Sequence, residues 1–127
     1  MKTVSPDSFD SVPLVDSAAA LERLDGEREI YSELIQTFLM QTDAHLEWMR
    51  LSTTPCDEAA RVLFTHQVHH LKGAAMTVGA ERLAARCAYI EQLLRSGDCD
   101  AARAELPGMP ELYRISAEAL KEAADNS

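Results

Sequence analysis

Two adjacent histidines, a lysine and a glycine lie close together in the segment VHHLKGAAMTVG, which covers residues 68–79. The spacing of leucine, valine and alanine in this segment indicates a helix interior, where a glycine costs about 1 kcal/mol relative to alanine. On such a helix His69 and Gly73 are one turn apart, and Lys72 flanks His69 at the i,i+3 spacing. The sequence therefore places the histidine, the lysine and the missing side chain on one solvent-facing patch.

The residue types on this patch suit phosphoryl chemistry. A neutral imidazole offers an unprotonated nitrogen as a nucleophile, because histidine side chains in general titrate near a pKa of about 6.5. A phosphoryl group on His69 would need a positive neighbour, which the ammonium of Lys72 can supply. Gly73 would let the active site of another protein approach the ring closely. Further residues on this helical face would give that protein a surface to bind: Val62, Thr65, His66 and Met76. Together these features predict a phosphoryl relay.

The elements that must position this patch are helices, because apolar residues recur at three- and four-residue steps along nearly the whole chain. A short helix starts at Asp16 or Ser17, and a long second helix covers roughly 27–51. Thr54-Pro55 is typical of a helix start, which predicts a third helix over about 55–78. The core stripe of this third helix is expected at Phe64, Val68, Leu71, Ala75 and Val78.

Gly79 ends the third helix, and a fourth helix follows over 80–96. A fifth helix spans roughly 98–124, and the Pro-Gly-Met-Pro segment 107–110 kinks or breaks it near its start. Inward-facing side chains are expected along the last two helices: Leu83, Cys87, Ile90, Leu94, Leu106, Leu112, Ile115 and Ala119. Because short loops join long amphipathic helices, we expect an all-α fold. Its predicted form is an antiparallel up-down-up-down four-helix bundle with a short extra N-terminal helix.

The 127 residues suit one domain, expected over 16–125, after a flexible N-terminal segment or linker over 1–15 that lacks a helical stripe. The formal net charge is −9 without any cluster of lysine or arginine, which argues against nucleic acid or an anionic membrane as a partner. No apolar run approaches the roughly 18 residues of a membrane span. The three cysteines, Cys56, Cys87 and Cys99, form no CxxC pair. We therefore expect a cytoplasmic protein with reduced thiols.

The HxLKG motif of residues 69–73, followed six residues later by Gly79, resembles the signature of histidine-containing phosphotransfer (HPt) domains. The family usually has leucine, a small or apolar residue, and glutamate or glutamine at the positions of Leu83, Cys87 and Glu91. The resemblance covers about 14–122, which is nearly the whole chain.

The resemblance implies a phosphorelay carrier without kinase activity of its own. Such domains accept a phosphoryl group from the aspartate of a response-regulator receiver and pass it to another receiver, in relays that contain a hybrid sensor histidine kinase. By resemblance, His69 carries the phosphoryl group, Lys72 stabilises it and Gly73 admits the receiver, while Gly79 and Glu91 support the site. Mg²⁺ is expected in the receiver's acidic pocket. This chain is expected to bind no cofactor and to be a monomer.

Two other functions stay open at the level of the residues. A helical adaptor would bind a signalling partner through the surface over 62–76 without any chemistry. A small metal-binding bundle would use His66 and His70, which have the i,i+4 spacing of metal ligands on a helix. Glu91 is either a plain surface acid or a hydrogen-bond partner that holds the ring of the acceptor histidine across the helix pair. His45 is expected on or near the bundle surface.

Overall fold

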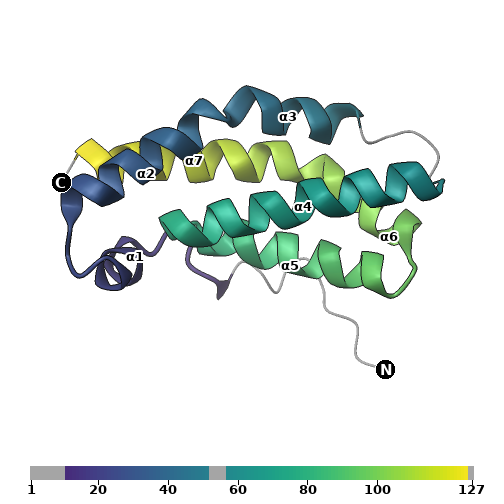
Figure 1. The fold of residues 1–127 in the computed structure, drawn as a ribbon, viewed down its shortest axis with the longest axis horizontal. Helices are drawn as coiled ribbons and strands as arrows, with labels where there is room; N and C mark the ends of the chain where they lie inside the picture. Colours follow the sequence, from purple (N-terminus) through teal and green to yellow (C-terminus); the bar gives the residue numbers. More distant parts are fainter. Residues whose placement is uncertain (1–10, 52–56, 126–127) are drawn as a thin grey trace.

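The computed structural model describes residues 11–51 and 57–125, and its regular elements in these ranges are all helices (Figure 1). They are α1 (Ser17–Arg23), α2 (Arg28–Met40), α3 (Thr42–Leu51), α4 (Glu58–Val78), α5 (Glu81–Arg95), α6 (Cys99–Ala104), the 3-10 helix η2 (Leu106–Gly108) and α7 (Met109–Asp125). Within the same ranges, no helix is both long enough and apolar enough to cross a membrane.

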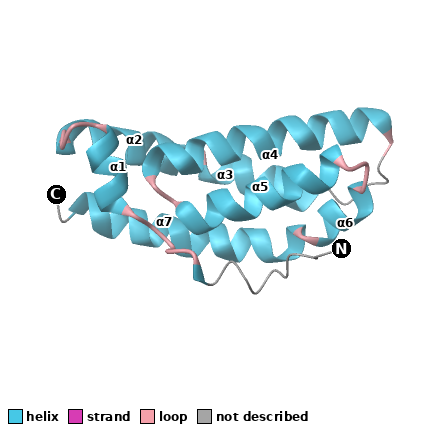
Figure 2. Cartoon of the chain, turned by 90° about the horizontal axis from the view of Figure 1, so that it is seen from below, coloured by secondary structure: helices cyan, strands magenta, loops and turns pink. Residues whose placement is uncertain are grey.

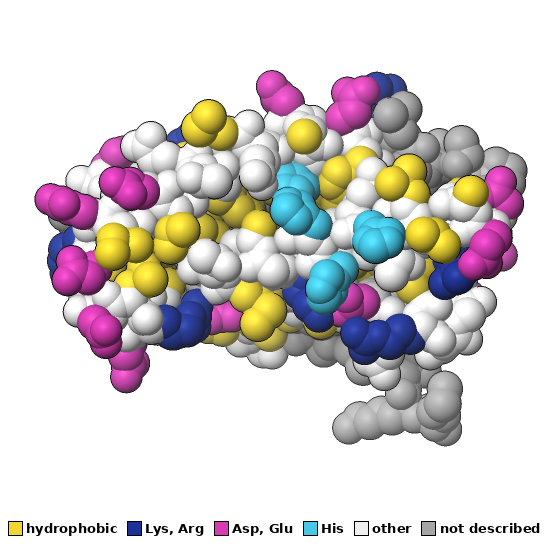
Figure 3. All heavy atoms as spheres, viewed as in Figure 1, with side chains coloured by type: hydrophobic (Ala, Val, Ile, Leu, Met, Phe, Trp, Pro, Cys, Tyr) yellow, Lys and Arg dark blue, Asp and Glu magenta, His cyan; other side chains and the backbone are white. Residues whose placement is uncertain are grey.

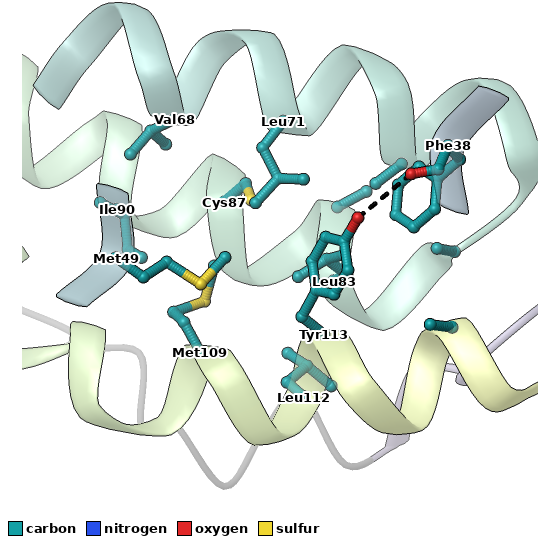
Figure 4. Packing of buried hydrophobic residues seen from close by; sticks show 14 of the residues in the cluster. Phe38, Met49, Val68, Leu71, Leu83, Cys87, Ile90, Met109, Leu112 and Tyr113 are labelled. Carbon is teal, nitrogen blue, oxygen red and sulfur yellow. Dashed lines mark hydrogen bonds between the residues drawn. The ribbon is translucent and has the colours of Figure 1, made fainter. Parts of the chain in front are cut away.

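The long helices lie side by side around one core (Figures 1 and 2). α4 packs against α5 and α2, and α7 packs against α2, α3 and α5, while α1 contacts α2 and α4. Side chains from several helices meet in the core, as Figure 4 shows for Leu71 of α4, Cys87 of α5 and Met109 of α7. The core therefore fixes which face of α4 points outward.

The apolar stripe predicted on the third helix is confirmed. Its residues are all buried on α4: Phe64, Val68, Leu71, Ala75 and Val78. The seam predicted on the fourth helix is buried on α5: Leu83, Cys87, Ile90 and Leu94. A stripe with a 3.6-residue period buries one face of a helix and leaves the other to solvent. Burial of this stripe thus turns the HxLKG motif side chains His69 and Lys72 away from the core.

The predicted helix over 27–51 is wrong as a single element, because it is interrupted at Gln41. The backbone N–H of Gln41 donates to the carbonyl of Phe38 three residues back (3.2 Å), and the hydroxyl of Thr42 donates to the carbonyl of Leu39 (2.7 Å). A threonine hydroxyl that binds a helical carbonyl competes with the helical hydrogen-bond ladder and often bends a helix. The apolar stripe continues across the interruption, so the hydrophobic period does not reveal it.

α4 begins at Glu58, later than the sequence predicts. Its N-cap is Asp57, whose side chain accepts a hydrogen bond from the backbone N–H of Ala60 (2.8 Å). Aspartate is among the strongest N-cap residues, since its carboxylate satisfies an N–H that has no partner in the helix. The predicted capping residues Thr54 and Pro55 lie outside the described residues.

One member of the predicted core is wrong: Ile115 of α7 is 38% exposed. Leu112 is buried as predicted, and α7 turns Tyr113 and Ser116 inward in addition. The hydroxyl of Ser116 donates to the carbonyl of Leu112 (2.7 Å), which satisfies a buried polar group that looks like a surface residue in the sequence. Tyr113 donates to the carbonyl of Phe38 (3.3 Å), as Figure 4 shows.

The predicted break in the fifth helix is confirmed, because α6, η2 and α7 are separate elements.

The cysteines differ in their states. Cys87 is free, and burial raises the pKa of its thiol to about 12. Cys99 is disulfide-bonded, so the expectation of reduced thiols is wrong for this residue. Cys56 lies outside the described residues. Sequence spacing could not predict a pairing, because only the fold determines which thiols are close in space.

The end of α4 is tied to the elements before it. Gly79 has a left-handed φ of 81°, and its carbonyl accepts a hydrogen bond from the backbone N–H of Asp16 (2.8 Å). The carbonyl of Val78 accepts from the hydroxyl of Tyr31 (2.9 Å). The last carbonyls of a helix have no partners within it, so these bonds satisfy groups that would otherwise be unpaired. They also fix the residue at which α4 ends.

The segment before α1 also contacts the bundle. The guanidinium Nε of Arg82 donates to the carbonyl of Val12 (2.9 Å), and Leu14 and Val15 pack against the core. Part of the segment that the sequence groups with the N-terminus therefore contacts the bundle, through Val12, Leu14 and Val15.

Candidate functional site

His69 projects from α4 into solvent, with 68% of its side chain exposed, and α5 holds one of its ring nitrogens. Nδ1 of His69 lies 2.6 Å from Oε2 of Glu91. An ionised carboxylate can only accept a hydrogen bond, so the neutral imidazole carries its proton on Nδ1 and keeps an unshared electron pair on Nε2. The geometry therefore leaves Nε2 as the ring nitrogen with an unshared electron pair on the exposed side chain.

Glu91 is buried, with 5% of its side chain exposed, and donors from two helices surround its carboxylate. Nζ of Lys72 lies 2.5 Å from Oε1, and Nη2 of Arg95 lies 3.3 Å from the same oxygen. Burial on its own would raise the pKa of Glu91, but hydrogen bonds from Lys72 and His69 lower it below its ordinary value. Of the two interpretations left open for Glu91, the structure shows the hydrogen bond to the ring.

The cations of the site are held by this carboxylate. Lys72 is only 22% exposed in its side chain, and its ammonium turns from α4 toward Glu91. The two polar residues of the motif on α4, His69 and Lys72, thus meet the same carboxylate. Arg95 was missed by sequence reasoning. Its i,i+4 spacing from Glu91 on α5 is the signal that would have identified it.

A groove of about 460 Å³ separates α2 from α4 beside the histidine. Its walls include Leu34 and Phe38 on α2 and His69 and Gly73 on α4. A Cβ atom added at Gly73 would meet nothing within 4 Å, so this glycine does not serve a close contact between helices. The absent side chain leaves the surface next to the imidazole open.

The predicted binding residues lie outside the lining of this groove and differ in their surroundings. Val62 and Met76 are exposed, and both remain available to a partner. The hydroxyl of Thr65 donates to a carbonyl of its own helix (2.8 Å). His66 faces α3, where it lines a second pocket. Histidine side chains gather on one face of the molecule (Figure 3), which is the face of the HxLKG motif.

The prediction that His45 lies on or near the surface is wrong, because this residue is buried. Its Nδ1 accepts a hydrogen bond from Nε1 of Trp48 (3.0 Å), and its ring stacks on His70 with centroids 5.9 Å apart. The pKa of His45 is lowered to about 4, mainly by burial and to a smaller extent by electrostatic repulsion from His70. The i,i+3 spacing of His45 and Trp48 was the available signal, since it allows the two rings to meet on one helix.

We expect the buried His45 to make folding sensitive to acid. In the unfolded chain it takes up a proton near pH 6.5, whereas the folded protein excludes the proton until about pH 4. The free energy of unfolding should therefore fall as the pH drops from 6.5 to 4, by up to about 3 kcal/mol from this residue. Urea denaturation at both pH values should show a smaller drop for His45→Gln than for the parent. The exposed residue His66 provides the control variant His66→Gln, and an equal drop in both variants would refute the assignment.

The candidate metal pair is not part of a larger cluster. Across residues 11–51 and 57–125, no group of three or more His, Cys, Asp or Glu side chains is placed to hold a metal ion. Of the pair considered from the sequence, His70 stacks on His45, and His66 lines the second pocket with both of them.

The fold and the site define a class of protein: a helical bundle that presents one histidine, with its Nδ1 held by a buried glutamate, on an open surface. The sequence matches the Hpt domain family over residues 33–126, and the protein belongs to this family. It is thus a phosphotransfer carrier of two-component signalling. No significant match was found among curated proteins or among solved structures.

Proposed function

We propose that this protein accepts a phosphoryl group on Nε2 of His69 from a response-regulator receiver and passes it to another receiver. The observation that carries the proposal is the 2.6 Å hydrogen bond between Nδ1 of His69 and the buried carboxylate of Glu91. This bond leaves Nε2 as the nucleophile on an exposed ring. Membership of the Hpt family supports the same function. The Mg²⁺ for the transfer would be held by the receiver.

The proposed step exchanges one bond to phosphorus for another. Nε2 of His69 attacks the phosphorus of the receiver's aspartyl phosphate, and the N–P bond forms as the P–O bond to the aspartate breaks. The aspartate leaves as a carboxylate with the bonding electron pair. Positive charge develops on the imidazole ring, and the carboxylate of Glu91 at Nδ1 stabilises it. The reverse exchange delivers the phosphoryl group to the second receiver.

Lys72 balances negative charge in both states of the site. Before transfer its ammonium neutralises Glu91, and after transfer the phosphoryl group adds roughly two negative charges one turn away. Arg95 supplies a second cation from α5. The pair of cations lets a dianion form beside a buried carboxylate.

We expect Lys72→Ala to slow phosphoryl uptake or shorten the lifetime of the phosphohistidine by up to about tenfold, because the charge it offsets is partly screened by solvent. Lys72→Arg should keep the charge and lose only part of the activity, since the larger guanidinium must fit the same space. Transfer rate and hydrolysis half-life at low and high salt measure both effects. Lys121→Ala on α7, which removes an exposed lysine paired with Glu118, is the matched control. Parental values for Lys72→Ala at low salt would contradict the role of its charge.

We expect the groove at Gly73 to admit the receiver. Gly73→Ala should raise the free energy of unfolding by up to about 1 kcal/mol, because its methyl group enters open space on a helix. The bulkier Gly73→Gln should leave the fold intact and slow phosphoryl transfer. Urea denaturation and transfer rates measure the two effects. An unfolded Gly73→Gln protein, or one that transfers at the parental rate, would contradict the steric role.

We also infer the finer architecture and state of this carrier. The up-down-up-down four-helix bundle would consist of α4, α5, α7 and the pair α2 and α3, which together count as one helix. The extra N-terminal helix would be α1. The chain would act as a monomer. The close packing of α4 on α5 and of α7 on α2 supports this arrangement.

The proposed function is tested by incubating the protein with phosphorylated receivers of the source organism. We expect label to move from at least one receiver to this chain, in a bond that is labile to acid and stable to base. Those two properties distinguish phosphohistidine from phosphoserine and from aspartyl phosphate. The absence of label with every receiver, or a bond that survives acid, would contradict the proposal.

A further inference from the structure

Arg95 is the last residue of α5, and its guanidinium lies beside the ring of His69. Nη2 of Arg95 is 3.3 Å from Oε1 of Glu91, while the other oxygen of this carboxylate, Oε2, lies 2.6 Å from Nδ1 of His69. The guanidinium and the imidazole therefore contact the two oxygens of one carboxylate. Only the width of that carboxylate and two polar contacts separate Arg95 from the ring.

The two cations of the site approach His69 from different helices. Lys72 follows His69 by one turn on α4, and Arg95 follows Glu91 by one turn on α5. α5 runs back along α4 and packs closely against it (Figures 1 and 2). A step forward on α5 is therefore a step backward on α4. The backbones of Lys72 and Arg95 thus lie on opposite sides of His69 along the helix axis.

The carboxylate holds these two cations with different firmness. Nζ of Lys72 lies 2.5 Å from Oε1 of Glu91, and only 22% of the lysine side chain is exposed. The side chain of Arg95 is 70% exposed, and its contact with Glu91 is the only ion pair or hydrogen bond that it makes with the described residues. A buried carboxylate is strongly destabilised when it loses its cation, whereas an exposed ion pair contributes little. Lys72 is therefore bound to remain with Glu91, and Arg95 is free to take another acceptor.

The chemistry of the guanidinium suits a phosphoryl group. It has five N–H donors in a planar fork that can bind two phosphoryl oxygens at once, whereas an ammonium acts as a point charge. Before transfer the site contains one carboxylate and two cations, an excess of one positive charge in a chain whose net charge is −9. A phosphoryl group with roughly two negative charges would more than offset this excess.

We propose that Arg95 is a catalytic residue of phosphoryl transfer, whose guanidinium binds oxygens of the phosphoryl group as this group reaches Nε2 of His69, while Lys72 stays on Glu91. The inference rests on the proposed function, since it requires a phosphoryl group on His69. In the transition state the negative charge is spread over the phosphoryl oxygens, and donors already in place stabilise it. The same contacts persist in the phosphohistidine. Arg95 therefore acts on both the rate of uptake and the lifetime of the product.

The test compares Arg95→Gln and Arg95→Lys with a matched control, Arg114→Gln. Arg114 is an exposed arginine of α7 that also pairs with a glutamate of its own helix, Glu111 at 3.5 Å. Label is supplied by receivers that label the parent and, separately, by phosphoramidate, a small donor that releases ammonia and needs no docking surface. The half-life of the phosphohistidine is measured after the donor is removed.

We expect Arg95→Gln to take up label about tenfold more slowly from both kinds of donor, and its phosphohistidine to hydrolyse about tenfold faster. Arg95→Lys should recover part of both losses, because it keeps the charge and lacks the planar fork. Arg114→Gln should match the parent. Urea denaturation should give equal stability for Arg95→Gln and Arg114→Gln, since each loses one exposed ion pair.

Nuclear magnetic resonance can detect the proposed contact directly. In ¹⁵N-arginine-labelled protein, the guanidinium resonances of Arg95 should shift when phosphoramidate labels His69, and those of Arg114 should stay unchanged. A shift confined to Arg95 would support the contact, and an unshifted Arg95 resonance in fully labelled protein would overturn it.

The remaining outcomes separate this role from the proposed function. Parental uptake and half-life in Arg95→Gln would overturn the inference and leave the proposed function in place. Slow uptake from receivers alone, with parental labelling by phosphoramidate and a parental half-life, would also overturn it, because Arg95 would then contact the receiver and not the phosphoryl group. If neither donor labels the parent, the proposed function fails and the inference fails with it.

Discussion

His69→Gln should take up no label from any phosphorylated receiver or from phosphoramidate, whereas His70→Gln should still be labelled. The difference follows from the surroundings of two adjacent imidazoles. His69 has its Nδ1 fixed by Glu91 at 2.6 Å and its side chain in solvent. His70 stacks on the buried ring of His45 and has no carboxylate within ion-pair distance among the described residues. Only His69 combines an oriented tautomer with access for a partner.

The measurement is incorporation of ³²P followed by the acid and base stability of the label. Thermal denaturation of both variants serves as the control for folding, since both positions are exposed and neither substitution should unfold the bundle. Labelling of His69→Gln together with loss of label in His70→Gln would show that the acceptor has been assigned to the wrong ring. A parent protein that never takes label, together with a receiver that binds His69→Gln as tightly as the parent, would indicate an adaptor without chemistry.

Gly79→Ala should lower the free energy of unfolding by about 3 kcal/mol, a large share of the 5–15 kcal/mol typical of a domain. Two costs add at this position. A left-handed φ of 81° disfavours any residue with a Cβ by roughly 1–2 kcal/mol. The new Cβ would also lie 2.7 Å from the carbonyl oxygen of Asp16 and 3.1 Å from the Cβ of Ala20, so the backbone must shift.

Two other glycines provide matched controls for this prediction. Gly97 has a similar φ of 79° but nothing within 4 Å of an added Cβ, so Gly97→Ala should cost only about 1 kcal/mol. Gly73 is helical and open, so the same substitution there should stabilise the protein. Urea denaturation of the three variants at pH 7 gives the comparison. Equal losses in the free energy of unfolding for Gly79→Ala and Gly97→Ala would mean that the contact with Asp16 does not destabilise the Gly79→Ala protein.

The sequence predicts those features that depend on a single helix. The core stripe of α4 from Phe64 to Val78 and the left-handed end at Gly79 are local, because a 3.6-residue period and one glycine are enough to specify them. The relative placement of His69, Lys72 and Gly73 on one patch follows from the same helix. These features position the proposed acceptor, His69, before any packing is known.

The features that the sequence does not predict depend on contacts between elements. Whether Glu91 reaches the ring of His69 is decided by the packing of α5 on α4, and Arg95 joins the site only through that carboxylate. His45 is buried because Trp48 supplies a partner for one of its nitrogens, so a polar residue occupies a position that the pattern assigns to the surface. The interruption at Gln41 arises from a hydroxyl–carbonyl bond that leaves the apolar stripe unchanged.

The hydrogen bond from His69 to Glu91 has a kinetic consequence for the relay. In the proposed transfer, the phosphoryl group must arrive at Nε2 and depart from Nε2 through the same opening, because Nδ1 is occupied by a buried carboxylate. The donor receiver therefore has to dissociate before the acceptor receiver can bind. Transfer should follow ping-pong kinetics, and each receiver should competitively inhibit the other.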